Sequence, residues 1–306
     1  MLNRRQTLFG GLALSACAPV GAPPDAGYPP RDDPRFTAIE RRIGGRVGVA
    51  ALNTASGAWL THRANERFAL CSTFKWLLAA QMLKMAEWEP GFLRQEVLYS
   101  EDDLLSYAPA AREHIADGPM GRMGRMSVEQ MCEAIVVLSD NTCANLLLEG
   151  GMGPAGFTRF LRENGDGVTR LDRYEIELND VPPGDERDTT TPDAMARTMR
   201  RFLLGHMEIG EPPLNQASRE MLIGWLVASR TGRERLRAGL PADWRVGDKT
   251  GTWNGEHNAA NDVAIAWPPG RDPIVIACYL SGSTVEPAAR NAAHAEIAAI
   301  VAQEWG

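Results

Sequence analysis

The stretch ERFALCSTFKWLLAAQML, residues 66–83, passes from an extended run into an apolar segment that is typical of a buried helix. Ser72 is then expected in the first helical turn and Lys75 one turn later. Residues three apart share a helix face, so the lysine amine can reach the serine hydroxyl, and the helix N-terminus favours negative charge there. This pattern makes Ser72 a candidate nucleophile. The alternative is that Ser72 only caps the helix and that Lys75 is solvated.

Three other short motifs follow in the chain. Residues 139–141, Ser-Asp-Asn, end one helical run and start another, and residues 249–251, Lys-Thr-Gly, end a predicted strand. Gly251 would let a ligand approach the backbone of that strand closely. Residues 175–179 lie in the glutamate loop, a polar stretch over 166–188 that is too long for an ordinary connection and is therefore expected to be functional. Each motif alone has a structural explanation, but their joint occurrence favours a catalytic site.

Strands are predicted near both ends of the sequence and helices in its middle. The patterns predict a helix over 33–44, a hairpin over 46–62, antiparallel strands over 245–251, 262–267 and 273–279, and a helix over 287–305. We therefore predict an α/β fold of the α+β type, an antiparallel sheet flanked by helices and built from both termini, with an all-helical subdomain beside it. A crevice between the two parts is the expected substrate site.

The domain boundaries follow from the composition along the chain. Residues 1–16 carry two arginines before a short apolar run, as in a twin-arginine signal peptide, so export to the periplasm is expected. Residues 17–34 are rich in proline and form a predicted flexible tether. The catalytic domain is expected over 35–306, with an α/β part at about 35–70 and 217–306 and a helical part at about 71–216.

The cysteines suggest how an exported protein is anchored. Residues 14–17, Leu-Ser-Ala-Cys, resemble the lipobox of bacterial lipoproteins, which would attach the mature protein to the membrane through a lipidated Cys17. The alternative is a plain secretory signal that is cut a few residues later. The remaining cysteines permit disulfides, but their pairing stays open. They are Cys71, Cys132, Cys143 and Cys278. We interpret Cys71, which precedes Ser72, as a small packing residue.

The composition argues against several classes of function. The chain has 306 residues and a net charge of −7, without a block of Lys or Arg, which argues against nucleic acid or an anionic membrane surface as a main partner. The five histidines are scattered and no HExxH or HxHxD motif occurs, so neither a metal nor another cofactor is expected. The absence of GxSxG argues against an α/β-hydrolase. We expect a monomer that acts on a small molecule.

From about Arg35 to the C-terminus, the chain resembles a class A serine β-lactamase. Its Ser-x-x-Lys at 72–75, Ser-Asp-Asn at 139–141 and Lys-Thr-Gly at 249–251 match the signature that this class shares with penicillin-binding proteins. The glutamate-bearing stretch over 172–179 separates the class from penicillin-binding peptidases. The resemblance implies hydrolysis of the β-lactam amide of penicillin- and cephalosporin-type antibiotics, and with it antibiotic resistance.

The resemblance assigns the steps of this reaction to particular residues. Ser72 would attack the amide, and its backbone N–H would form the oxyanion hole together with that of Thr252. Glu175 and Asn179 would hold and activate the water that hydrolyses the acyl-enzyme. Whether Lys75 or Glu175 accepts the serine proton stays open.

Other residues would bind the substrate and protonate its leaving group. The resemblance implies that Ser139, helped by Lys249, passes a proton to the ring nitrogen. Asn141 would bind the side-chain amide of the substrate, and Thr250 and Thr252 its carboxylate.

Several positions allow two interpretations. Arg235 matches an arginine that pairs with the substrate carboxylate in some members, but a solvated arginine is the alternative. Tyr107 matches an aromatic residue at the cleft entrance, with ordinary packing as the alternative. Trp253 stands where some carbapenem-hydrolysing members carry the partner of Cys71, so carbapenem hydrolysis is not predicted. The stretch over 117–125 either reshapes the cleft rim or adds surface.

Two other functions share part of the pattern. A penicillin-recognising peptidase or esterase, or a non-enzymatic β-lactam sensor, would keep Ser72 but release the acyl group slowly. Glu175 and Asn179 argue against both. In the family, Arg173 and Asp188 pair to brace the glutamate loop, which is a structural role.

Overall fold

The computed structural model describes residues 32–119, 121–206 and 210–306. The predicted signal peptide over 1–16, Cys17 and most of the predicted tether over 17–34 lie outside the described residues. Within the described ranges, no helix combines the length and the apolar character needed to cross a membrane.

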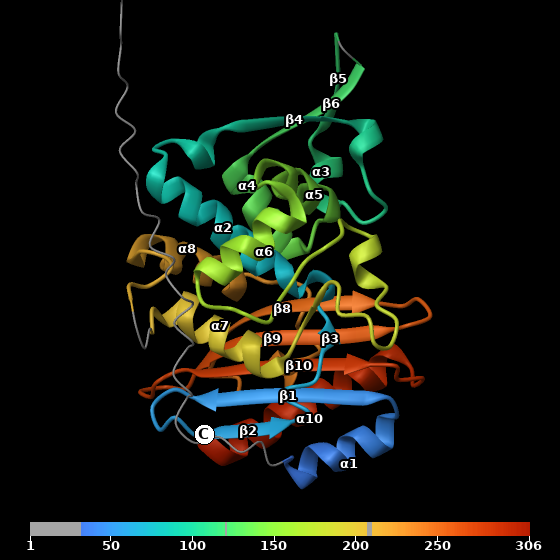
Figure 1. Ribbon diagram of the computed structural model, residues 1–306, viewed down its shortest axis with the longest axis vertical. Helices are drawn as coiled ribbons and strands as arrows, with labels where there is room; N and C mark the ends of the chain where they lie inside the picture. The colour runs from blue at the N-terminus through green and yellow to red at the C-terminus, as the bar shows by residue number, and fades with distance from the viewer. Residues whose placement is uncertain (1–31, 120, 207–209) are drawn as a thin grey trace, which may run out of the picture.

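In the described part of the chain, strands from both ends form one antiparallel sheet in the order β2, β1, β10, β9, β8 (Figure 1). They are β1 Arg46–Asn53, β2 Trp59–His62, β8 Arg245–Trp253, β9 Ala259–Trp267 and β10 Ile274–Ser281. The N-terminal hairpin joins the C-terminal strands because β1 pairs with β10, with Val49 opposite Cys278. This arrangement confirms the predicted sheet built from both termini. β8 is the edge strand next to the helical part (Figure 1).

Helices cover both faces of this sheet. α1 Pro34–Ile43, α9 Leu236–Gly239 and α10 Pro287–Trp305 pack on the outer face, whereas α7 Pro192–Leu204 and α8 Gln216–Val227 contact the inner face. Successive strand residues point to opposite faces, so Val49 joins the outer core and Ala50 the inner one. Asp33 caps α1 by accepting a hydrogen bond from the backbone of Arg35, as expected for the predicted helix start.

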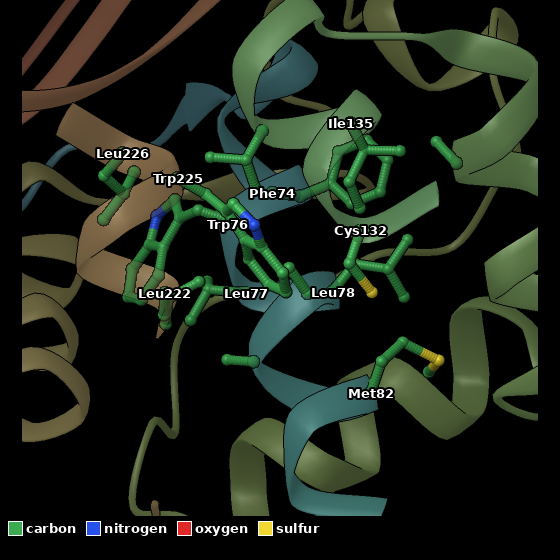
Figure 2. Close-up of a cluster of buried hydrophobic side chains, with 14 of the residues drawn as sticks. Phe74, Trp76, Leu77, Leu78, Met82, Cys132, Ile135, Leu222, Trp225 and Leu226 are labelled. Carbon is green, nitrogen blue, oxygen red and sulfur yellow. The ribbon is translucent and has the colours of Figure 1, made fainter. Parts of the chain in front are cut away.

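α2 Lys75–Trp88 runs through the centre of the helical part. Its residues from Lys75 to Leu83 are all buried, as expected for a helix that is apolar on every side. It follows a 3₁₀ turn, Cys71–Phe74, and its neighbours include α4 Val128–Glu133, a π-helical turn Ala134–Leu138, α5 Asn141–Gly150 and α6 Gly153–Glu163. Figure 2 shows Trp76 and Leu77 of α2 between Cys132 of α4 and Trp225 of α8.

The helical part also contains a small antiparallel sheet within the described residues, in the order β4 Glu96–Ser100, β6 Gly121–Ser127, β5 Ile115–Gly118. The prediction of an all-helical subdomain is therefore wrong for residues 96–127. β6 is rich in Gly, Met and Arg, and none of the three strands has the clear apolar alternation that marks a strand in a sequence. Gly124 is required where β6 passes Tyr99, because a Cβ there would lie 2.2 Å from the ring. The stretch over 117–125 is part of a hairpin that projects beyond the helices (Figure 1).

Short elements connect the nucleophile segment to the end of the glutamate loop. β3 Phe68–Ala69 pairs with β7 Thr189–Thr190, and the backbone N–H of Leu70 donates to Asp188 O at 2.8 Å. The other short helical turns are Phe92–Arg94, Glu101–Asp103, Glu177–Asn179 and α3 Pro109–Glu113. The glutamate loop therefore returns to the chain directly before Ser72.

Candidate active site

A cleft of about 630 Å³ lies between the edge strand β8 and the helical part. Most of the predicted site residues line it, namely Ser72, Tyr107, Ser139, Asn141, Glu175, Asn179, Arg235, Thr250 and Thr252. Lys75, Lys249 and Gly251 are buried next to these residues in sequence or in space. The structure therefore brings together the residues that the four motifs supply from distant parts of the chain.

Ser72 lies in the 3₁₀ turn that leads into α2, and Lys75 is the first residue of that helix. Lys75 is fully buried, so its interpretation as a solvated lysine is wrong. Its Nζ donates to Ser139 O at 2.9 Å and to Asn141 Oδ1, and it forms an ion pair with Glu175 Oε1 at 2.9 Å. The Ser72 hydroxyl donates to the same Glu175 oxygen at 3.3 Å. The serine and the lysine therefore meet at one carboxylate oxygen.

The surroundings of Lys75 define its charge. Three acceptors around Nζ match the three N–H donors of an ammonium, whereas a neutral amine has only two. Burial of a lone ammonium would cost several kcal/mol, but here Glu175 supplies the opposite charge and two oxygens accept the remaining protons. The contacts of Lys75 therefore fit an ion pair between its ammonium and the Glu175 carboxylate.

Asn145 of α5 fixes the position of Glu175. Its amide nitrogen donates to Glu175 O, and its amide oxygen accepts from Glu175 N, both at 2.9 Å. Asn179 Nδ2 donates to Glu175 Oε2 at 2.6 Å. One oxygen of the carboxylate thus faces Ser72 and Lys75, and the other faces Asn179. Glu175 is buried, and its peptide bond to Ile176 is cis.

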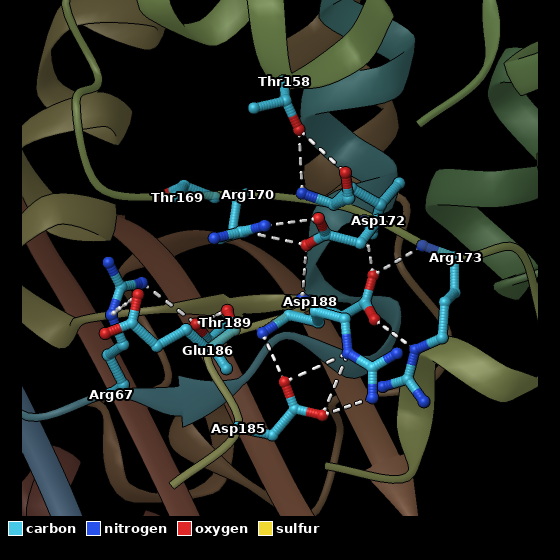
Figure 3. A network of polar contacts seen from close by, with 12 residues as sticks. Arg67, Thr158, Thr169, Arg170, Asp172, Arg173, Asp185, Glu186, Asp188 and Thr189 are labelled. Atoms are coloured by element: carbon cyan, nitrogen blue, oxygen red, sulfur yellow. Dashed lines mark hydrogen bonds and ion pairs between the residues drawn. The ribbon is translucent and has the colours of Figure 1, made fainter. Parts of the chain in front are cut away.

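The ends of the glutamate loop are held by a network of carboxylates and arginines (Figure 3). Asp188 is fully buried and accepts from Arg173 Nε at 2.6 Å and from the backbone N–H groups of Asp172 and Arg173. The backbone N–H of Asp188 in turn donates to Asp172 Oδ2 at 3.2 Å. These contacts pair the two ends of the loop, as the bracing role of Arg173 and Asp188 in the family leads one to expect.

Ser139 lies between the two buried lysines. Lys249 Nζ donates to Ser139 Oγ at 2.9 Å, and Lys75 Nζ donates to the Ser139 carbonyl. Burial and the positive charge of Lys75 hold the pKa of Lys249 well below its usual value. A lysine that gives up its proton readily can replace a proton that the neighbouring hydroxyl donates. The Ser139 hydroxyl is therefore suited to proton transfer.

Gly251 lets β8 pass directly beside the nucleophile. A Cβ at this position would lie 2.9 Å from Leu70 O and 3.1 Å from Ser72 N, so any other residue would push the strand away. Gly251 therefore allows the backbone of β8 to approach the backbone of Leu70 and Ser72. The sequence instead suggested that the glycine makes room for a ligand. The close approach brings the strand that carries Thr252 next to the amide of Ser72, which is the arrangement that the expected oxyanion hole needs.

Arg235 is buried against β8, so its interpretation as a solvated arginine is wrong. Its guanidinium donates to Gly251 O at 3.0 Å, to Asn261 O at 2.7 Å and to Thr252 Oγ1 at 2.7 Å. Of its two arginine neighbours, Arg233 is exposed and Arg237 pairs with Asp248. A cation next to a threonine hydroxyl at the cleft wall is suited to bind a carboxylate.

The structure also decides between the alternatives for Tyr107 and Cys71. Tyr107 lines the cleft with half of its side-chain surface exposed, which does not fit ordinary core packing. Cys71 is buried, and burial together with the Glu175 charge raises the pKa of its thiol. A protonated thiol is a poor nucleophile, so the interpretation of Cys71 as a packing residue holds. All four cysteines that the structure describes are free.

Sequence reasoning missed several residues of the site. Asn145 is one of them, although it lies one helical turn after Asn141 and therefore on the same face of α5. Thr231 lines the cleft and accepts from Thr250 Oγ1 at 2.7 Å, and Asn261 Nδ2 donates to Ala69 O beside the nucleophile segment. No sequence signal marks these two residues.

Comparisons with known proteins agree with this geometry. The profile of the Beta-lactamase enzyme family matches residues 33–305. Beta-lactamase FAR-1 of Nocardia farcinica is 47% identical over 83% of this chain and 76% of its own length. Beta-lactamase L2 of Stenotrophomonas maltophilia is 42% identical over 98% of each chain.

Solved structures give the same result. A structure titled "Ancestral (GNCA) Beta-lactamase class A" superposes with a TM-score of 0.82 and 51% identity, over 89% of this chain and 99% of that one. A β-lactamase from Xanthomonas campestris pv. campestris has the same TM-score at 44% identity, over 89% of this chain and 97% of its own. Fold, site geometry and sequence similarity lead to one conclusion: the chain belongs to the β-lactamase enzyme family and is a class A serine β-lactamase.

Proposed function

We propose that Glu175 accepts the proton of Ser72 during acylation and activates water during deacylation. The observation that carries this proposal is that the Ser72 hydroxyl and the Lys75 ammonium both contact Glu175 Oε1. A lysine whose three protons are engaged cannot accept a fourth, so the carboxylate is the available base. As the bond from Ser72 Oγ to the β-lactam carbonyl forms, the proton moves to Glu175, and the oxyanion is stabilised by the N–H groups of Ser72 and Thr252.

Ser139 completes the acylation step. When the amide C–N bond breaks, the ring nitrogen needs a proton, and the Ser139 hydroxyl donates it while Lys249 replaces the lost proton. The 2.9 Å contact from Lys249 Nζ to Ser139 Oγ and the lowered pKa of Lys249 support this route. The strained ring opens, and the acyl group stays on Ser72 as an ester.

Deacylation uses the other side of the same carboxylate. Asn179 Nδ2 donates to Glu175 Oε2 and to Ile176 O, which uses both of its N–H groups. Its buried Oδ1 has no partner among the described residues, so a water bound between Asn179, Glu175 and the ester would donate one proton to this oxygen and one to the carboxylate. Before deacylation, Glu175 releases the proton taken from Ser72 to solvent and Lys249 regains one from solvent, so Glu175 is again a carboxylate. Glu175 then takes a proton from this water, the hydroxide adds to the ester carbonyl, and Ser72 leaves with the proton returned by Glu175. The released product is the ring-opened acid.

The cleft wall binds the rest of the substrate. Thr250, Thr252 and Arg235 form a polar and cationic wall for the carboxylate common to penicillins and cephalosporins. Asn141 faces the cleft and binds the amide of the substrate side chain, and Tyr107 flanks the entrance.

Turnover of a chromogenic cephalosporin tests this function. We expect the purified enzyme to hydrolyse many equivalents of nitrocefin per molecule, because Glu175 and Asn179 are placed to release the acyl group. The absorbance change is followed with substrate in hundredfold excess over enzyme. A burst equal to one equivalent, followed by no further change, would instead indicate a peptidase or a sensor.

We also propose that the enzyme is exported to the periplasm and anchored there as a lipoprotein. The arginine pair before a short apolar run supports export, and the Leu-Ser-Ala-Cys sequence at 14–17 supports lipidation at Cys17. We expect radioactive palmitate to label the mature protein and Cys17→Ser to remove the label without loss of nitrocefin hydrolysis. Unlabelled, soluble mature protein would reject the lipid anchor.

A further inference from the structure

The half of the glutamate loop that follows Asn179 needs a support of its own. Before this point, Asn145 holds the backbone of Glu175 by two hydrogen bonds. After it, the chain continues through Asp180 to the loop tip over 182–184. A groove of about 660 Å³ separates this tip from the segment around Arg67, so the tip is not packed against the body of the protein there. The contacts of Asn179 with Glu175 Oε2 and Ile176 O lie within the loop, so this half of the loop still needs a fixed point outside it.

Asp180, the residue after Asn179, supplies that point. Its Oδ1 accepts from the indole Nε1 of Trp253 at 3.3 Å and contacts His257 Nδ1 at 3.0 Å. Because a carboxylate only accepts, the His257 ring carries its proton on Nδ1. The hydrogen bond from His257 holds the pKa of Asp180 below its usual value, which keeps the carboxylate charged. The backbone oxygen of Asp180 also accepts from Arg173 Nη2 at 3.0 Å.

Trp253 extends this contact to the nucleophile segment. Its side chain packs against a small apolar cluster that contains Cys71, Ala69 and Ala259, and Val181 of the loop packs on the same cluster. Gly255 is required for this position, because a Cβ there would lie 2.4 Å from the indole nitrogen. The indole therefore lies between the residue before Ser72 and the residues after Asn179.

The turn that carries Trp253 and His257 is itself anchored to α10. The buried Arg290 donates to Asn254 Oδ1 at 3.3 Å and to Asn258 Oδ1 at 3.5 Å. The two partners of Asp180 are thus presented by a turn that is fixed to the body of the α/β part. The Asp180 carboxylate, which binds this turn, is therefore held at a fixed position relative to β8 and Gly251.

We propose that Asp180, Trp253 and His257 form a clasp that positions Asn179 and Glu175 for hydrolysis of the acyl-enzyme. The clasp rests on the proposed function of Glu175 and Asn179 and adds three positioning residues to it. The clasp acts on deacylation more than on acylation, because Asn179 contacts the water-activating carboxylate. Ser72, Lys75 and Ser139 have no contact with Asp180 in the described part of the chain.

Steady-state kinetics with benzylpenicillin distinguish these two steps. For a reaction through an acyl-enzyme, kcat/KM reports acylation, whereas a slower deacylation lowers kcat and KM by the same factor. We expect Asp180→Ala and Trp253→Phe to lower kcat and KM together by about tenfold, since a catalytic group that is slightly misplaced loses rate steeply. The value of kcat/KM should stay close to that of the parent. Acid quenching and intact-mass analysis should show a larger fraction of acyl-enzyme in the steady state.

Matched variants distinguish loss of the clasp contacts from a general loss of protein stability. Trp253→Phe keeps an aromatic ring at this position and removes the N–H donor together with part of the apolar surface, so it tests the contact if Asp180→Ala does not fold. Asp180→Asn keeps an oxygen acceptor and should retain most of the parent kcat. Glu256→Gln lies in the same turn, is exposed and should behave as the parent. In the double variant, Trp253→Phe should add little to Asp180→Ala, since both break one contact.

Two results would overturn the clasp. The first is a parent kcat in both Asp180→Ala and Trp253→Phe, and the second is a fall in kcat/KM as large as that in kcat. Failure of the underlying function looks different, because the unchanged enzyme would then release no acyl group after the first equivalent.

Discussion

Glu175→Ala is expected to be acylated by a penicillin and then to stall. The substitution removes the base that activates water, and a general base contributes roughly 10²- to 10⁴-fold to such a step. Acylation should continue, although more slowly. Lys75 loses its ion-pair partner and one of its three acceptors in this variant. Its amine then remains as a base for Ser72.

The measurement is the mass of the intact protein over time after mixing with benzylpenicillin. In Glu175→Ala we expect an adduct with the mass of the whole substrate that persists for minutes to hours. In the unchanged enzyme no adduct should remain once the substrate is consumed. Glu177→Ala is the matched control, because Glu177 is an exposed glutamate on the same loop. Turnover of Glu175→Ala at the parent rate would contradict the proposed role of Glu175, and so would loss of turnover without any adduct.

Ser72→Ala is expected to abolish the reaction at its first step. Without the hydroxyl no ester can form, and the activity should fall by roughly 10⁴- to 10⁶-fold, the scale on which loss of a nucleophilic serine acts in acyl-transferring hydrolases. The cleft should remain intact, since Ser72 contributes one hydrogen bond to Glu175 while Lys75 retains its own contacts. We therefore expect substrate binding without a covalent adduct.

Intact-mass analysis and nitrocefin hydrolysis together check this result. Cys71→Ala is the control, because it changes the neighbouring side chain, the other conceivable nucleophile, and should keep most of the activity. An adduct on Ser72→Ala that disappears in the double variant with Cys71→Ala would show that the thiol is the nucleophile. The raised pKa of Cys71 in its buried position argues for the opposite outcome.

Local patterns were sufficient for many elements and for the chemistry of the four motifs. The helix over 287–305 has the predicted bounds, because it begins with a proline in its first turn and is followed by apolar residues at helical spacing. The three small strands over 96–127 were missed, because their register is fixed by Tyr99 crossing Gly124 rather than by an apolar alternation. Pairing between distant residues leaves no such local trace.

The sequence by itself determined which residue types carry the reaction, since a nucleophile, two lysines, a serine and a glutamate are recognisable from their immediate neighbours. Only the tertiary structure decided how they are coupled. It selected Arg235 from three nearby arginines, brought Glu175 to Ser72 and Lys75, and set Asp180 against Trp253. These choices depend on which side chains are buried together, and burial is a property of the folded chain rather than of any short stretch of it.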